Sequence, residues 1–296
     1  MNGGIGNAAE ATPLVQAIRA LWPKSEITIF PPSGDLLDDW CVVNNVARSA
    51  EDLNDESFTH TFLTYYSEIN TCGTSCNFGK VYRIERLLGP EFLKPEREYN
   101  LDMLRRLGYK GPTPPLYVSL REPKEITLSG GLRICLVPGS KPQHRWRNKR
   151  WPYFKELTET LLRDYSNAHV FIIGTKEDHV PASLFCSSRV VDLRGQLTLR
   201  EVAWTMRQSH LVIGNDCGPM HIADAVQTLS IWIFGPSCVL KNDPLYKSVV
   251  VAKGLKCSPC QYNRQLENCE NPVCITDLNP DIVLKHVSTL FNYVSS

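Results

Sequence analysis

The sequence has no strong excess of charge of either sign, because 32 Lys and Arg residues face 31 Asp and Glu residues, for a formal net charge of +1. Such a chain has no overall attraction for nucleic acid or for an anionic membrane, so any basic site must be local. It also lacks an apolar run of membrane-spanning length, and its N-terminus lacks the basic and apolar blocks of a signal peptide. We therefore expect a cytoplasmic protein without a transmembrane segment.

Size and composition favour two domains. The chain has 296 residues, of which 43% are hydrophobic and 21% charged, enough to bury two cores. Its 11 cysteines are an odd number and are scattered, except for four near the C-terminus. This usage is more typical of reduced thiols with one metal cluster than of a disulfide framework.

The second half alternates between strand-like and helix-like segments. Strands are predicted within 132–137, 169–174, 190–192, 210–215 and 229–234, and helices within 151–165, 198–209, 219–226 and 281–294. This alternation predicts a parallel sheet with helices on both faces, where ligands bind at the C-terminal ends of the strands.

The first half is less regular. It shows helical periodicity at 11–23 and 95–109 and a short strand at 25–30, whereas 35–94 has no clear pattern. A stretch rich in Pro, Gly and charge follows at 110–131, as is typical of linkers. We place the domain boundary there, between residues 125 and 126.

A basic loop follows the first strand of the second half. "GSKPQHRWRNKRWP" carries five Lys or Arg residues between Lys141 and Arg150, contains no acid, and leads into a helix. A cationic loop at the start of a helix suits a diphosphate. The alternative is an ordinary solvated surface loop.

A second loop, "IGNDCGPMHIADA", places Asp216 after a strand and opens a helix with Gly218 and Pro219. The N–H groups of residues 217 to 220 would then face the strand ends and hold phosphate oxygens. For His221, a partly buried structural histidine and a catalytic one both remain open.

The third loop, "CSPCQYNRQLENCENPVC", spaces its thiols as C-x2-C-x8-C-x4-C. Four thiolates in two short pairs can bind zinc or iron tetrahedrally. A structural metal site and free or paired thiols both stay open for this set: Cys257, Cys260, Cys269 and Cys274.

The chain starts with "NGGIGNAAEATP", a glycine-rich turn leading into a helix. Such turns bind ligands when a buried strand precedes them, yet only Met1 and Asn2 stand before these glycines. Either the sequence is shortened or the strand is deleted, and the neighbouring strands would then keep an unpaired edge.

Several segments together resemble glycosyltransferase family 9, the ADP-heptose:lipopolysaccharide heptosyltransferases. They are "PGS…KRWP", "FIIGTKED", "DLRGQLTLREVA", "LVIGNDCGPMHIADAV" and "IFGPS", with "GGIGNAAEATPLVQAIRALWP" at the N-terminus. The resemblance implies an α/β protein of GT-B architecture, with two Rossmann-like domains whose parallel sheets face each other across a cleft. It implies an acceptor domain at 1–125, a nucleotide-sugar domain with a cysteine-rich tail at 126–280, and a C-terminal helix at 281–296 that packs back toward the first domain.

The same resemblance implies an inverting, metal-independent transfer of heptose from ADP-heptose to a glycan such as the lipopolysaccharide core, with peripheral membrane contact. Lys149 would stabilise the departing diphosphate. Besides Lys149, the implied donor-binding residues are Gly139, Ser140, Glu201, Asp216, Cys217, Gly218, Pro219 and His221, and the implied acceptor-side loop contains Gly3, Gly4 and Gly6. Cys217 departs from the family pattern, which has a hydroxyl residue there.

A larger departure is Asn7, which stands where the family has an Asp that is thought to be the general base. An amide does not accept a proton at neutral pH. Glu10 lies nearly one helical turn further on and would serve instead, unless it is simply an acid on the helix surface.

Other functions remain open. A sugar-nucleotide isomerase of GT-B architecture would use a similar donor crevice, and a glycosyltransferase could act on a nucleic acid or a protein. A weakly active homologue would only bind the nucleotide-sugar. A nucleic-acid-binding protein is disfavoured by the near-neutral charge and by the lack of basic stripes with interleaved aromatics.

Overall fold

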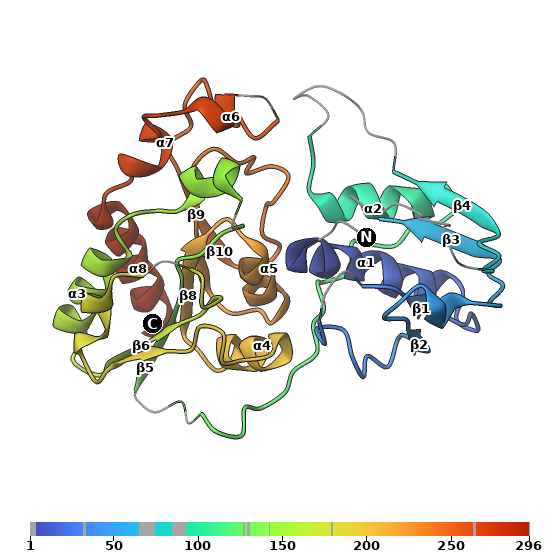
Figure 1. Cartoon of the computed structure of the whole chain (residues 1–296), viewed down its shortest axis with the longest axis horizontal. Coiled ribbons are helices and arrows are strands. Elements are labelled where there is room, and N and C mark those ends of the chain that lie inside the picture. Colours follow the sequence, from blue (N-terminus) through green and yellow to red (C-terminus); the bar gives the residue numbers. More distant parts are fainter. Residues whose placement is uncertain are drawn as a thin grey trace. The chain divides into compact units, whose positions relative to one another are not determined.

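A computed structural model describes residues 4–31, 34–64, 75–84, 93–126, 128, 131–141, 143–178, 180–262 and 265–295 (Figure 1). The chain divides into two compact units, Met1–Ser119 and Leu120–Ser296. The sequence predicts this boundary six residues later. Each unit is described by itself.

The second unit is built on a six-stranded sheet in the order β10-β9-β8-β5-β6-β7, with every pairing parallel. Its strands are β5 (Leu132–Val137), β6 (Ala168–Ile172), β7 (Val190–Asp192), β8 (Leu211–Asn215), β9 (Ser230–Phe234) and β10 (Ser248–Ala252). The expected strands and the parallel sheet are confirmed, and β10 is an additional edge strand. The strand order reverses between the neighbouring strands β5 and β8, where open α/β sheets bind their ligands.

Helices cover both faces of this sheet (Figure 1). They are α3 (Phe154–Asp164), α4 (Leu199–Arg207), α5 (Gly218–Ala225) and α8 (Pro280–Ser295), with the shorter α6 (Gln265–Asn268), α7 (Val273–Thr276), η3 (His144–Lys149) and η4 (Ala182–Cys186). Helix α8 contacts α3, β9 and β10 of its own unit. Its expected packing toward the first unit stays a prediction. Among the described residues, no helix combines the length and apolar character needed to cross a membrane.

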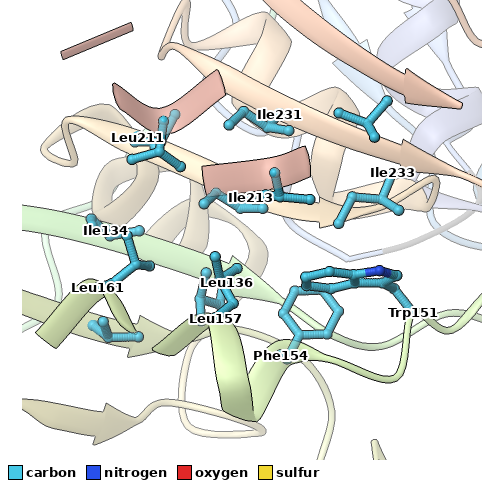
Figure 2. Packing of buried hydrophobic residues seen from close by; sticks show 14 of the residues in the cluster. Ile134, Leu136, Trp151, Phe154, Leu157, Leu161, Leu211, Ile213, Ile231 and Ile233 are labelled. Carbon is cyan, nitrogen blue, oxygen red and sulfur yellow. The ribbon is translucent and has the colours of Figure 1, made fainter. Parts of the chain in front are cut away.

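The largest core of the second unit lies between the sheet and the face that carries α3 and α8. Figure 2 shows Leu157 and Leu161 of α3 packed toward Ile134 and Leu136 of β5, all fully buried. Since side chains alternate along a strand, Cys135 points to the opposite face, where its thiol lies 3.1 Å from the Ser209 hydroxyl. This packing fixes the strand ends from which the candidate site is built.

The first unit contains two long helices, α1 (Ile5–Leu21) and α2 (Glu96–Arg105), together with the short η1 (Glu51–Leu53). Helix α1 begins earlier than expected, with Gly4 as its N-cap, so Gly6 and Asn7 are helical rather than part of a loop. Pro13 lies inside this helix and has no N–H to donate to the Ala9 carbonyl. The Thr12 hydroxyl donates to that carbonyl instead, at 2.7 Å.

Two parallel strand pairs complete the described part of the first unit. They are β1 (Thr28–Ile29) with β2 (Asn45–Val46), and β3 (His60–Leu63) with β4 (Lys80–Arg83). Within the described residues no hydrogen-bonded ladder joins the two pairs, whereas the sequence predicts one parallel sheet.

Candidate functional site

In the second unit, the loops at the strand-order reversal are tied together by Asn215, the last residue of β8. Its side-chain oxygen accepts the Trp151 N–H at 3.0 Å, and its amide donates to the Pro138 carbonyl at 2.6 Å. Asn215 is fully buried, and an unpaired buried amide would be costly, so these bonds fix the loops after β5 and before α3. The sequence places Asn215 on this strand end but does not predict the bonds.

The next residue, Asp216, brings together charged and polar groups from three segments. The Lys149 ammonium at the end of η3 lies 2.7 Å from the Asp216 carboxylate. Asn242, in the loop after β9, donates to both carboxylate oxygens at 3.1 Å. Two residues that the sequence predicts for one site are therefore in contact, and Asn242 joins them from a loop without a recognisable pattern.

The Lys149–Asp216 pair is largely buried but still reaches solvent, because the side chain of Lys149 is 13% exposed and that of Asp216 is 3% exposed. Burial raises the pKa of Asp216, but the nearby Lys149 ammonium and the Ser237 hydroxyl outweigh it and hold that pKa below its ordinary value. Asp216 is therefore ionised at neutral pH and holds the Lys149 side chain in place by direct contact. Lys149 also lies over the Trp146 ring, 5.3 Å from its centroid.

Helix α5 begins beside this pair, with Cys217 as its N-cap and Pro219 in its first turn. Pro219 has no N–H, and the Met220 N–H donates to the Cys217 carbonyl at 3.1 Å. The sequence predicts that the N–H groups of residues 217 to 220 face an anion. Of these four, the N–H groups of Cys217 and Gly218 are the ones that can still bind it. Burial raises the pKa of the Cys217 thiol to about 12, so the thiol stays protonated and is no nucleophile at neutral pH.

Other predicted donor residues lie on the same unit with structural contacts of their own. His221 is 5% exposed and meets Trp232 edge to face, with ring centroids 5.0 Å apart. The Glu201 carboxylate accepts the Thr198 N–H at 2.8 Å and closes the capping box at the start of α4. The Ser140 hydroxyl donates to the Trp146 carbonyl at 3.4 Å.

Gly139 lies directly against the Asp178 side chain. A Cβ atom there would lie 2.3 Å from the carboxyl carbon of Asp178, which the Thr175 N–H holds at 2.8 Å. Asp178 thus brings a second acid to the ends of β5 and β6; it ends the segment "FIIGTKED" but is not among the site residues that the sequence predicts.

The basic loop also clamps the cysteine-rich segment. Arg147 donates to the Glu267 carbonyl at 3.3 Å, and the Asn148 amide donates to the Cys269 carbonyl at 3.0 Å. The loop that positions Lys149 is therefore attached on its other side to the residues between Cys257 and Cys274. Neither the diphosphate nor the surface-loop interpretation of the charge run predicts this attachment.

The four cysteines of that segment line one cavity of about 40 Å³, together with Asn148 and neighbouring apolar residues. Burial and the neighbouring thiols raise the pKa of Cys260, and the same two causes raise that of Cys274 to about 11. In the described part of the chain, however, no three His, Cys, Asp or Glu residues are grouped closely enough to hold a metal ion. The four thiols therefore line one cavity but are not arranged as a metal site in the described residues.

In the first unit, the predicted acceptor loop is joined to α2 through Asn7. The Asn7 side-chain oxygen accepts the Gly4 N–H at 2.8 Å, and its amide donates to the Glu96 carboxylate at 2.5 Å. Glu96 is 3% exposed. Gly3 lies outside the described residues, and Gly6 is in the first turn of α1.

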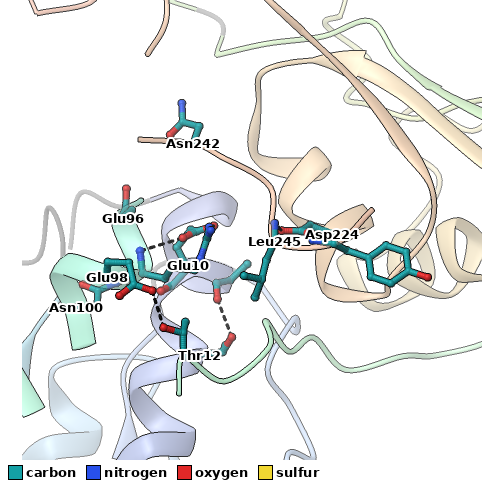
Figure 3. A network of polar contacts seen from close by, with 12 residues as sticks. Glu10, Thr12, Glu96, Glu98, Asn100, Asp224, Asn242 and Leu245 are labelled. Atoms are coloured by element: carbon teal, nitrogen blue, oxygen red, sulfur yellow. Dashed lines mark hydrogen bonds and ion pairs between the residues drawn. The ribbon is translucent and has the colours of Figure 1, made fainter. Parts of the chain in front are cut away.

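Glu10 lies one turn further along α1 and is 1% exposed, so it is not on the helix surface (Figure 3). Its carboxylate accepts the Arg97 N–H at 3.0 Å and pairs with the Arg97 guanidinium at 3.5 Å. The Asn100 amide donates to the Glu10 carbonyl at 3.0 Å. These contacts fasten α1 to α2, and a role of Glu10 as general base stays a prediction.

Comparison with known proteins gives a consistent result. Residues 130–270 match the model of "Glycosyltransferase family 9 (heptosyltransferase)". The lipooligosaccharide heptosyltransferase 2 of Campylobacter jejuni serotype O:6 is 25% identical over 156 residues, which are 48% of this chain and 47% of that protein. The chain thus matches about half the length of this curated relative.

Solved structures extend the similarity of fold to nearly the whole chain. The ADP-heptose lipopolysaccharide heptosyltransferase II of E. coli superposes with a TM-score of 0.72 at 17% identity, covering 99% of this chain and 97% of that one. The iron-containing dodecameric glycosyltransferase TibC of enterotoxigenic E. coli gives 0.67 at 16% identity, covering 100% and 78%. Over residues 130–270 the chain is thus similar to glycosyltransferase family 9, and over nearly its whole length it has the GT-B fold of the solved heptosyltransferase structures.

Proposed function

We propose that this protein is a glycosyltransferase that moves a sugar from a nucleotide-sugar to a hydroxyl group of a glycan. The observation that carries the proposal is the Lys149–Asp216 pair at the strand-order reversal, 2.7 Å apart and largely buried. Asp216 is tied to Asn242 and Lys149 to the basic loop, so the cation is held in place before a ligand arrives. A preorganised cation is what a leaving diphosphate requires.

The proposed reaction is a direct displacement. The acceptor hydroxyl attacks the anomeric carbon as the bond to the diphosphate breaks, which inverts the configuration at that carbon. Lys149 and the N–H groups of Cys217 and Gly218 stabilise the charge that develops on the diphosphate. In this proposal the transfer proceeds without a catalytic metal ion.

The proposed donor is ADP-heptose and the proposed acceptor the lipopolysaccharide core. The support comes from the names of similar proteins, a lipooligosaccharide heptosyltransferase and a TibC structure in complex with ADP-D-beta-D-heptose. The proposal includes the cytoplasmic location and the peripheral membrane contact that the sequence predicts.

A structural zinc or iron ion at the cysteine-rich segment is part of the proposal. The shared cavity of Cys257, Cys260, Cys269 and Cys274 supports it, as does the iron in TibC, whose fold is similar. Thiolates bind either metal, and binding would draw the four sulfurs together and hold the segment on the basic loop.

Nucleotide binding tests the donor site. Because Lys149 would make a charge-assisted hydrogen bond to the diphosphate, Lys149→Ala should weaken ADP binding by about 1–3 kcal/mol in isothermal titration calorimetry. The control is Lys155→Ala, which removes a lysine that pairs with Glu159 on the surface of α3. Equal ADP affinity in the natural chain and Lys149→Ala would remove Lys149 from the donor site.

A further inference from the structure

Asn242 brings an oriented hydrogen-bond acceptor to the Lys149–Asp216 pair. Its amide nitrogen donates to both oxygens of the Asp216 carboxylate, each at 3.1 Å, and one of them, Oδ2, is also the oxygen that Lys149 contacts at 2.7 Å. An ionised carboxylate only accepts hydrogen bonds, so the amide nitrogen faces Asp216 and the amide oxygen points away from it. The Asn242 amide and the Lys149 ammonium are therefore neighbours on one carboxylate oxygen.

The loop that carries Asn242 is held by α5, the helix that begins at the same site. Figure 3 shows Asp224 of α5 beside Leu245. Asp224 is 3% exposed, and its two carboxylate oxygens accept the N–H groups of Leu245 at 2.7 Å and Tyr246 at 2.6 Å. On the other side of the loop, the Asn242 N–H donates to the Val239 carbonyl at 3.1 Å. The position of Asn242 is thus fixed before a ligand arrives.

The amide oxygen of Asn242 is available to a ligand. Among the residues that the structure describes it has no hydrogen-bond partner, and Asn242 is partly exposed. The phosphate oxygens that Lys149 would bind are acceptors themselves, so the group that meets this oxygen must be a donor such as a hydroxyl. The phosphate that leaves is bonded to the anomeric carbon, so the transferred sugar lies closer to Lys149 than the ribose does.

We propose that the Asn242 side-chain oxygen accepts a hydrogen bond from the hydroxyl on the carbon next to the anomeric carbon of the donor sugar, which makes Asn242 a specificity-determining residue; this inference rests on the donor site of the proposed function. That hydroxyl is the sugar hydroxyl nearest to the bond that breaks. A sugar without it leaves the oriented oxygen unpaired, which costs affinity. The site therefore selects nucleotide-sugars that carry a hydroxyl on this carbon.

The test compares three ligands by isothermal titration calorimetry with the full chain: ADP, ADP-heptose and ADP-2-deoxy-2-fluoro-heptose, in which fluorine replaces the hydroxyl. Fluorine donates no hydrogen bond, so the natural chain should bind the fluorinated donor about 2–10-fold more weakly than ADP-heptose, the range for one neutral hydrogen bond. In Asn242→Ala the two donors should bind equally. The ratio of their affinities is the readout, because loss of the contact with Asp216 would weaken all three ligands alike.

Two further variants separate recognition from folding. Asn242→Asp keeps an acceptor oxygen, and the proton that two such close carboxyl groups share takes the place of the amide hydrogen, so the ratio should keep its natural value. Asn167→Ala is the matched control. It removes an exposed asparagine just before β6, at the opposite end of the sheet from the site, and it should also keep the ratio.

The outcomes distinguish this inference from the proposed function. Equal binding of both donors by the natural chain, an unchanged ratio in Asn242→Ala or a lost ratio in Asn242→Asp would overturn the role of Asn242, while ADP binding would still support the donor site. The expected ratios without acceptor-dependent transfer by the natural chain would support the role of Asn242 and overturn the transferase. No binding of ADP or of either donor to the natural chain would overturn both.

Discussion

Asp216 shows how one residue supports both the structure and the chemistry of the site. It is 2% exposed, and burial alone would disfavour its charge. Lys149 and Asn242 make the charge favourable by direct contacts. The resemblance to glycosyltransferase family 9 predicts a role for Asp216 and Lys149, which lie in two recognisable loops. It gives no signal for Asn242, whose position depends on how the loop after β9 folds back.

The pKa of Asp216 leads to a prediction about acid stability. Burial raises this pKa, but the Lys149 ammonium and the hydrogen bonds to the carboxylate lower it by more. The pKa of Asp216 therefore lies below the ordinary 3.8. A carboxyl whose pKa is lower in the folded state stabilises the fold fully above its unfolded pKa, and that contribution is lost as the pH falls through the folded value. We expect Asp216→Asn to show a shallower loss of unfolding free energy than the natural chain between about pH 5 and about pH 2.

Urea denaturation across this range measures the difference. Asp164→Asn is the control, because Asp164 pairs with Arg163 on the surface, where such pairs contribute little. Parallel pH curves for the natural chain and Asp216→Asn would contradict the assignment of a lowered pKa to Asp216.

At the scale of elements, periodicity predicts the second unit well and the first unit poorly. Buried parallel strands such as β5 and β8 appear as continuous apolar runs, and α3 has one apolar face. The strands β1 and β2 have two residues each, too few for a period to appear. The contacts of Asn7 with Glu96 and of Arg147 with the cysteine-rich segment join distant residues, and no local pattern announces them.

The cysteine-rich segment carries a prediction at the same scale. If its four thiols bind an ion, native mass spectrometry should find one zinc or iron per chain, and Cys257→Ser or Cys274→Ser should lose it. Cys41→Ser is the control, since Cys41 is an exposed thiol of the other unit. A metal-free chain with unchanged stability would contradict a structural metal at this segment.

For the whole molecule, the resemblance to glycosyltransferase family 9 predicts an α/β fold of GT-B architecture, which the structure and the similar solved structures confirm. The sequence-based boundaries of the parts and the roles of the site residues remain predictions. These roles depend on side-chain contacts such as that between Lys149 and Asp216, which the residue order alone does not reveal.

The most direct test of the account is whether the full chain transfers a sugar. Incubation with ADP-heptose, with and without a lipopolysaccharide-core acceptor, should release ADP only when the acceptor is present. Mass spectrometry should show one added heptose on the acceptor for each ADP released, because transfer couples the two events. Conversion of the nucleotide-sugar without acceptor would indicate an isomerase, and ADP-heptose binding without release in either mixture would indicate a binding protein. Either result would contradict the proposed transferase.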